Sequence, residues 1–187
     1  MDAQYNVILA DPPWWYADRK NGGNKTKFGG GAQKHYPLMR DSELLSLAPF
    51  VQNLTTENAA LFLWTTMPRL DFAVSLLKAW GFRYATTAFV WVKPSIGGRW
   101  HNGPGYYTAS NAEVVILGVK GRMKPVRTML DSVVCVPKTR HSEKPSEVRK
   151  RIEQMYPTGR KIELFARARF DGWDAWGNEL EQAKPRQ

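Results

Sequence analysis

Residues 5–16 read YNVILADPPWWY, and this stretch indicates the fold class of the whole chain. Its first half, from Tyr5 to Ala10, is a short apolar run of the kind that forms a buried strand. Asp11-Pro12-Pro13 follows at once, and proline has no N–H with which to continue a central strand. The first element we expect is therefore a buried strand that stops before two prolines.

Apolar runs and helical patterns alternate along the rest of the chain. Strands are expected at 59–64, 85–92, 112–119, 133–136 and 161–166, and helices at 41–51, at 68–80 before Gly81, and from 142–145 to about 156. Strands that alternate with helices of this length predict an α/β fold with a mostly parallel sheet and helices on both faces. Such sheets bind ligands beyond the carboxyl ends of their strands, so we expect the chemistry there.

The length and composition suit one compact domain over residues 1–187, because 43% of the 187 residues are apolar. No apolar run approaches the roughly 18–20 residues of a membrane span, and the N-terminus has no signal segment, so a cytoplasmic protein is expected. The single cysteine, Cys135, excludes an internal disulfide, and with three scattered histidines it excludes a Cys/His zinc site. No metal is predicted.

The formal charge of +10 is concentrated in two places. Residues 120–169 hold 14 basic and 5 acidic side chains, and five cations lie among glycines between Arg19 and Lys34. We interpret residues 16–36, and the second glycine-rich stretch at 94–110, as flexible loops. Clustered cations are typical of proteins that bind a phosphate backbone, whereas the alternative is the solvated surface of a basic protein.

Asp11, Pro12, Pro13 and Trp14 are the candidate catalytic residues. A carboxylate that only accepts hydrogen bonds, a rigid turn that leaves carbonyls exposed and a broad aromatic face suit a planar group with an exocyclic NH₂. If Asp11 and the Pro12 carbonyl accept the two hydrogens of such an amine, its lone pair is directed at an electrophile such as a methyl sulfonium. The alternative is a motif that only ends a strand and packs.

This DPPW motif resembles motif IV of the amino-methyltransferases that use S-adenosylmethionine, in the form with aspartate that is typical of adenine-N6 methylation. The chain as a whole resembles the MT-A70 family of adenine-N6 methyltransferases. The other matching segments, in family order, are 35–39 (HYPLM), 61–64 (LFLW), 89–93 (FVWVK), 111–121 (NAEVVILGVKG), 141–145 (HSEKP), 161–167 (KIELFAR) and 176–179 (WGNE).

The resemblance implies a Rossmann-like methyltransferase fold in which the catalytic motif precedes the strand that binds S-adenosylmethionine, here 161–166. It also implies that Asp11, Lys120, Arg167, Arg169, Asn178 and Glu179 contact this cofactor, with Lys120 near its carboxylate. Phosphate binding or solvation is the alternative for the two arginines, and a turn or cap for Asn178 and Glu179. Phe170 departs from the family, which often has a small polar residue there.

An amine in a stacked, paired base is out of reach, so the target base must be single-stranded or flipped out. We expect Lys20, Lys93 and Arg99 to hold phosphates, and Trp14, Tyr36 and Trp100 to stack on bases. Lys25, Lys27 and Tyr106 are further candidates of the same two kinds. His141 is expected to shape a turn, and the cations of the last helix, at 149–151, to form its solvated face.

Three functions remain open from the sequence. The first is a DNA adenine-N6 methyltransferase of phage or bacterial type that acts in the bacterial or infected-host cytoplasm, with a homodimer as its candidate assembly. The second is an RNA adenine-N6 methyltransferase with the same mechanism. The third is a catalytically silent, nucleic-acid-binding partner subunit, against which the intact motif at Asp11 argues.

Overall fold

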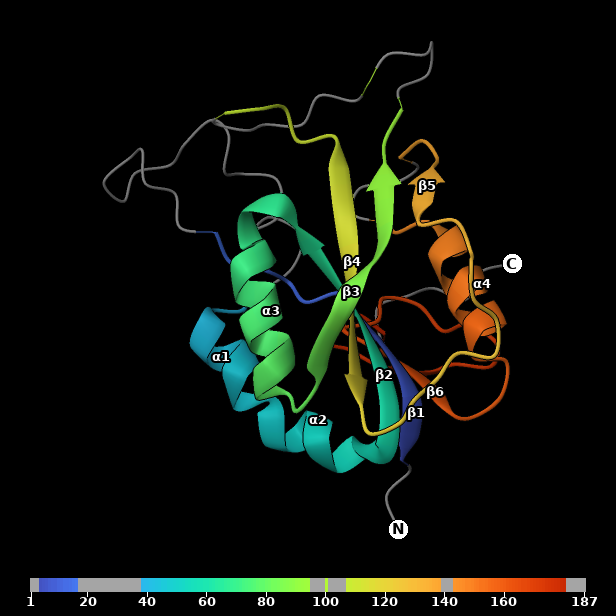
Figure 1. The fold of residues 1–187 in the computed structure, drawn as a ribbon. Coiled ribbons are helices and arrows are strands. Elements are labelled where there is room, and N and C mark those ends of the chain that lie inside the picture. Colours follow the sequence, from blue (N-terminus) through green and yellow to red (C-terminus); the bar gives the residue numbers. More distant parts are fainter. Residues whose placement is uncertain (1–3, 17–37, 95–99, 101–106, 139–142, 181–187) are drawn as a thin grey trace.

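The computed structural model describes residues 4–16, 38–94, 100, 107–138 and 143–180, and within them one sheet of seven strands crosses the molecule (Figure 1). The strand order is β5-β3-β4-β2-β1-β6-β7. The strands are β1 (Tyr5–Ala10), β2 (Thr55–Thr66), β3 (Arg83–Val92), β4 (Ala112–Lys120), β5 (Val133–Cys135), β6 (Lys161–Leu164) and β7 (Asp174–Trp176).

The expected mostly parallel sheet is confirmed, and β4 is the only described strand that runs against its neighbours. Val92, the last residue of β3, lies opposite Ala112, the first residue of β4. Two strands joined at the same end of a sheet must be antiparallel. The start of β4 therefore lies where β1, β2 and β6 end, and we call this side of the sheet the carboxyl edge.

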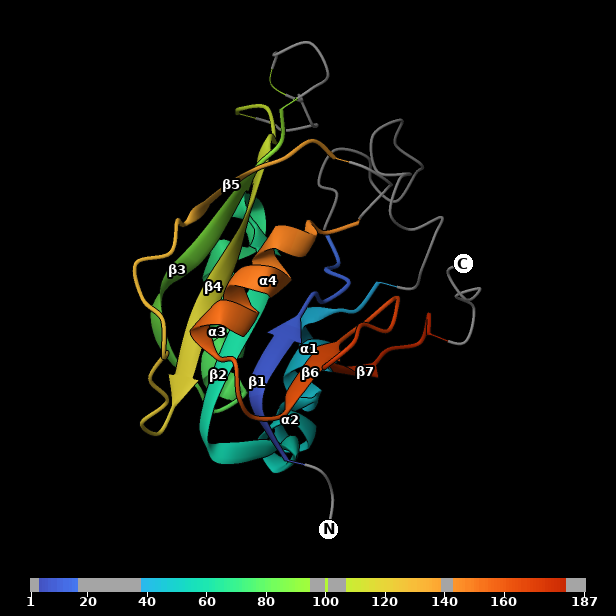
Figure 2. The ribbon, with the colours of Figure 1, turned by 90° about the vertical axis from the view of Figure 1, so that its right-hand side faces the viewer.

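Helices cover both faces of the sheet, as the sequence predicts (Figure 2). The 3₁₀ turn η1 (Met67–Arg69) and the helices α1 (Asp41–Ser46), α2 (Ala48–Leu54) and α3 (Leu70–Ala79) lie on one face, and α4 (Ser146–Met155) lies on the other. Side chains of β1 alternate between the two cores, with Ile8 packed beneath α1–α3 and Val7 and Leu9 beneath α4. Strand β1 is thus apolar from Val7 to Ala10 because both of its faces are covered.

Several boundaries differ from the sequence prediction. Strand β2 is longer than the expected 59–64, and β6 ends at Leu164 instead of 166. Three further differences have a local cause. The helix expected at 41–51 is two helices with a break at Leu47, because Pro49 in the first turn of α2 lacks an N–H to continue α1. The last helix begins only at Ser146, since Pro145 is extended and caps it. The three residues of β7 are too few to give a sequence signal. Gly81 ends the α3 region as expected, with φ of 91°.

None of the described helices has the length and apolar character needed to cross a membrane. The described residues also contain no cluster of three or more metal-binding side chains.

Candidate active site

Asp11 is the first residue beyond β1 at the carboxyl edge, where its N–H donates to the carbonyl of Leu164 at the end of β6. The two prolines then turn the chain sharply, so that the Trp14 N–H donates to the Pro12 carbonyl at 2.9 Å. The Pro13 carbonyl accepts from the N–H of Met39. The sequence predicts two acceptors for the target amine, the Asp11 carboxylate and the Pro12 carbonyl. The Trp14 N–H already occupies one lone pair of the Pro12 carbonyl, and the second lone pair is left to accept from an amine.

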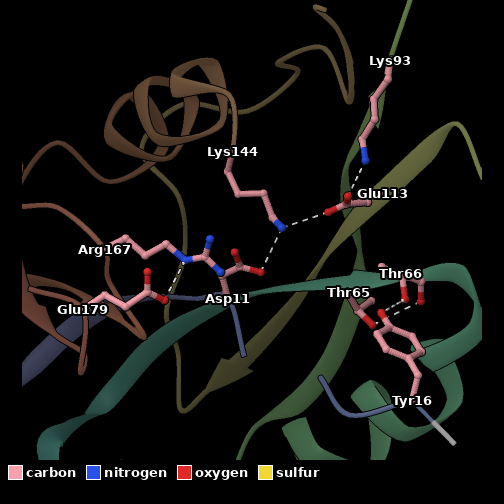
Figure 3. A network of polar contacts seen from close by, with 9 residues as sticks. All are labelled: Asp11, Tyr16, Thr65, Thr66, Lys93, Glu113, Lys144, Arg167 and Glu179. Carbon is pink, nitrogen blue, oxygen red and sulfur yellow. Dashed lines mark hydrogen bonds and ion pairs between the residues drawn. The ribbon is translucent and has the colours of Figure 1, made fainter. Parts of the chain in front are cut away.

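Asp11 belongs to a chain of ion pairs (Figure 3). The Lys144 ammonium lies 3.0 Å from Asp11 Oδ1 and 2.9 Å from Glu113 Oε2. Glu113 also forms an ion pair with Lys93 through its other oxygen. Two carboxylates and two ammonium groups therefore alternate along the carboxyl edge.

The topology explains why these four side chains meet. Glu113 is the second residue of β4, and the antiparallel register places it between Thr66 of β2 and Trp91 of β3. Lys93 directly follows β3, and Lys144 directly precedes the extended Pro145 that caps α4. The site thus combines two strand ends, the start of a reversed strand and the entry to a helix.

Mutual attraction keeps Glu113 and Lys144 charged. Burial on its own would raise the pKa of Glu113, but the ammonium groups of Lys144 and Lys93 outweigh it and hold that pKa below its ordinary value. Burial would lower the pKa of Lys144, whereas Asp11 and Glu113 outweigh it and raise that pKa above its ordinary value. Lys144 is therefore a firmly held cation in contact with the candidate catalytic carboxylate.

The turn after β6 forms a second group of polar side chains at the same edge. Arg167 and Glu179 form an ion pair with Nε and Oε1 3.4 Å apart, and both are about one third exposed (Figure 3). Phe165 has a left-handed backbone with φ of 60°, and the next N–H, that of Ala166, donates to the Trp176 carbonyl. This strained turn brings the segment after β6 against the segment after β7.

The other three predicted cofactor residues take different positions. Lys120 is the last residue of β4, lies opposite Ala59 and donates to Thr55 at 3.1 Å. It lies seven positions along the strand from Glu113, about 23 Å, and therefore at the other edge of the sheet from Asp11. Arg169 is exposed and its charge acts on Asp174, at the start of β7. Asn178 is exposed beside Glu179.

Two predicted substrate residues are buried in the structure. Trp14 is only 6% exposed, because its ring packs edge-on against Phe72 and lies beneath the Arg69 guanidinium. It therefore offers no broad open face to a base. Lys93 is 8% exposed and engaged by Glu113 and the Trp91 ring, so it does not extend toward a phosphate.

Of the remaining predicted substrate residues, the structure describes Trp100. It is 56% exposed and forms an isolated antiparallel β-bridge with Pro94. The following lie outside the described residues, as do most of the predicted loops at 16–36 and 94–110: Lys20, Lys25, Lys27, Tyr36, Arg99, Tyr106 and His141.

The cations of α4 do not form a purely solvated face. Arg149 forms an ion pair with Glu163 of β6 at 2.6 Å, and its guanidinium lies 3.4 Å from the centre of the Phe170 ring. Arg151 donates to the Val133 carbonyl at 2.9 Å. Part of the positive charge at 120–169 therefore holds α4 to the sheet and is not available at the carboxyl edge.

Glu113 and Lys144 were not among the predicted site residues, although both lie in segments that carry the family resemblance. The signal in the sequence is a single carboxylate at the start of an otherwise apolar run, AEVVILGV, together with a lysine before the proline of a helix start. Neither feature alone points to the other, because 30 residues separate them in the chain.

Comparison with known proteins places the chain in a family. Residues 5–179 match the family model MT-A70. The chain is 37% identical over 194 residues to the type II methyltransferase M.MunI of Mycoplasma sp, an alignment that covers 97% of this chain and 80% of that protein. It is 28% identical to the N(6)-adenosine-methyltransferase MT-A70-like protein of Arabidopsis thaliana over 94% of this chain. It is 29% identical to the N(6)-adenosine-methyltransferase catalytic subunit METTL3 of Homo sapiens over 95% of this chain.

The chain spans 24% of the length of the Arabidopsis protein and 28% of the human one. The family match nevertheless covers almost the whole chain, including the motif at Asp11 and the turn after β6. The protein therefore belongs to the MT-A70 family, whose methyltransferases use S-adenosylmethionine.

Proposed function

We propose that this protein transfers a methyl group from S-adenosylmethionine to the exocyclic N6 amine of adenine in DNA. The observation that carries the proposal is the nitrogen donor already bound to Asp11, the Lys144 ammonium at 3.0 Å. A carboxylate that binds one N–H donor at the carboxyl edge offers the same hydrogen bond to the amine of a base. The preference for DNA is supported by the greater identity to the type II methyltransferase, 37%, than to the N(6)-adenosine-methyltransferases, 28–29%.

In this proposal Asp11 orients the target amine. The amine donates one hydrogen to the Asp11 carboxylate and the other to the free lone pair of the Pro12 carbonyl, so that the nitrogen lone pair faces the reactive methyl group. S-adenosylmethionine supplies that methyl group on a sulfonium sulfur. As the bond from the nitrogen to the methyl carbon forms, the bond from that carbon to sulfur would break and leave a neutral thioether. Asp11 stabilises the positive charge that develops on the nitrogen, which then loses a proton to water.

Lys144 has a definite part in this step. In this proposal its ammonium yields Asp11 Oδ1 to the amine, and Glu113, 2.9 Å away on its other side, remains as its partner. Lys144 thus neutralises the buried carboxylates before the substrate arrives and gives up one of two contacts when it does.

The turn after β6 is the proposed cofactor site. Arg167 suits the carboxylate of the methionine part, and Glu179 and Asn178 suit the ribose hydroxyls. Arg167 and Glu179 supply a cationic and an anionic side chain in contact at the edge where Asp11 lies, which fits a ligand bearing both a carboxylate and hydroxyl groups. Lys120, at the other end of β4, is left out of this assignment.

An RNA substrate is the second candidate, favoured by the two relatives named N(6)-adenosine-methyltransferases. The two can be separated by supplying labelled S-adenosylmethionine with single-stranded DNA, duplex DNA and RNA in parallel. We expect transfer to adenine in DNA and a loss of at least about 100-fold in Asp11→Ala. The matched control is Asp71→Ala, which removes an exposed aspartate in the first turn of α3.

Each outcome of this experiment is informative. Transfer only to RNA would replace DNA as the substrate, and transfer to cytosine would exclude the assignment to adenine. Activity that survives Asp11→Ala would exclude the mechanism. No transfer to any of the three polymers, with binding of S-adenosylmethionine also absent, would favour the silent partner subunit.

A further inference from the structure

We propose that Tyr16 is the side chain on which the target base stacks, in place of the buried Trp14. This inference rests on the proposed function, since it names the contact that holds the base whose amine meets Asp11. It concerns a residue that lies five positions beyond Asp11 and outside the four-residue motif.

Exposure separates the two aromatic rings. Trp14 is enclosed by Phe72 and Arg69, whereas Tyr16 is 41% exposed. Two other large apolar side chains near the ends of β1 and β2 are open as well. Trp15 is 37% exposed, and Met67, directly after β2, is 50% exposed.

The Tyr16 ring is fixed in place by its far end. Its hydroxyl shares a hydrogen bond of 2.7 Å with Thr66 Oγ1, at the last residue of β2 (Figure 3). A tyrosine side chain has few rotatable bonds, and this contact restrains them before any ligand binds. A ring that is both exposed and already oriented loses little conformational entropy when a base stacks on it.

The anchor places Tyr16 beside the ion-pair chain. Thr66 lies opposite Glu113 in the register of β2 and β4, and Glu113 is joined to Asp11 through Lys144. The charges of Glu113, Lys144 and Arg69 all act on the Tyr16 hydroxyl, and burial of that end of the side chain raises its pKa. The Tyr16 hydroxyl therefore lies at the carboxyl edge, beside the end of β2, which is the strand next to β1.

A stacking role makes a specific kinetic prediction. Base–aromatic stacking contributes about 1–3 kcal/mol per base, so Tyr16→Ala should raise the KM for a methylated oligonucleotide about tenfold or more. Tyr16→Trp should restore most of the affinity, because it keeps an aromatic face. The dissociation constant of S-adenosylmethionine should change by less than about twofold in both variants.

The anchor is tested separately with Tyr16→Phe and Thr66→Val, which each remove the hydrogen bond and keep the ring. Both should raise KM by only a few fold, and the double variant should be no worse than either single one. The matched control is Tyr84→Ala, since Tyr84 is 37% exposed and also contacts a threonine, Thr87, but lies opposite Gly118 toward the other end of the sheet.

Two results would overturn the proposal. One is a KM for Tyr16→Ala within twofold of the wild-type value, with the oligonucleotide still methylated. The other is a loss in Tyr16→Ala that Tyr16→Trp does not restore, or that affects cofactor binding equally, because a structural role would give that pattern. Wild-type protein that methylates no polymer would refute the proposed function itself, which the first assay detects independently.

Discussion

Lys144→Met removes the cation that joins the two carboxylates at the carboxyl edge while keeping a side chain of similar length. In the wild-type protein Lys144 is 23% exposed and lies 3.0 Å from Asp11 and 2.9 Å from Glu113. After the substitution, Lys93 is the cation left on Glu113, and Asp11 loses the ion pair with Lys144. We therefore expect a loss of stability together with a changed response to pH.

The magnitude follows from the distances and the burial. At an effective dielectric constant of about 20, each pair near 3 Å contributes roughly 5 kcal/mol of attraction, most of which offsets the cost of desolvating the charges. Removing one partner of a buried pair costs about 3–5 kcal/mol, and the partial exposure of Lys144 favours the lower end. We expect the free energy of unfolding at pH 7 to fall by about 3 kcal/mol.

The pH dependence gives this prediction its sign. The pKa of Glu113 is lowered from 4.5 in the fold, so its contribution is present above about pH 4.5 and is lost as the pH falls through the folded value. The pKa of Lys144 is raised from 10.5, so its contribution is present below that pH and is lost as the pH rises through the folded value. The difference between wild type and Lys144→Met should be largest between these limits and should shrink in acid.

Urea unfolding followed by tryptophan fluorescence measures both effects when it is done at pH 7 and at the lowest pH below 4.5 at which both proteins still fold. Lys78→Met, at an exposed position in the last turn of α3, is the matched control and should change the free energy of unfolding by less than about 0.5 kcal/mol. Equal stability of Lys144→Met and wild type at pH 7 would refute the argument. A loss of the same size at both pH values would refute it too, since packing and not charge would then be responsible.

Two further predictions concern the turn after β6 and the net charge. In Gly177→Ala the added Cβ would lie 2.4 Å from the Ala166 carbonyl oxygen, so the free energy of unfolding should fall by about 1–3 kcal/mol. Binding of S-adenosylmethionine, measured by calorimetric titration, should weaken as well. Unchanged affinity would show that this turn does not bind the cofactor. Raising the salt from 50 to 200 mM should weaken binding of DNA at least tenfold in an anisotropy titration, because cations that contact phosphates release counterions. An affinity that does not change with salt would mean that the charge of +10 is only solvated surface.

The local features of the fold could be predicted from the sequence because each has its own signal. The apolar run of β1 is buried on both faces and ends at the prolines, and Gly81 closes the α3 region with a positive φ. These features depend on neighbouring residues, and the α/β class follows from their alternation. Asp11 was located for the same reason, since it is the first residue past a recognisable strand.

The ion-pair chain could not be predicted, because it depends on strand direction and on contacts between distant segments. An apolar run such as β4 has no pattern that tells a parallel from an antiparallel neighbour, and only the antiparallel register brings Glu113 to the carboxyl edge. The same reversal puts Lys120 at the opposite edge of the sheet from Asp11. Burial of Trp14 likewise depends on Phe72 of α3, 58 residues later in the chain.

The reversed strand also bears on how Asp11 can serve two partners in turn. A lysine paired only with Asp11 would be left as an uncompensated buried cation whenever the target amine took its place, at a cost of several kcal/mol. Because β4 brings Glu113 within 2.9 Å of the same ammonium, Lys144 keeps one carboxylate when it releases the other. Lys93, on the far oxygen of Glu113, keeps that carboxylate charged throughout. The exchange at Asp11 then replaces one charge-assisted hydrogen bond by another, and the proposed reaction requires no buried charge to stand alone.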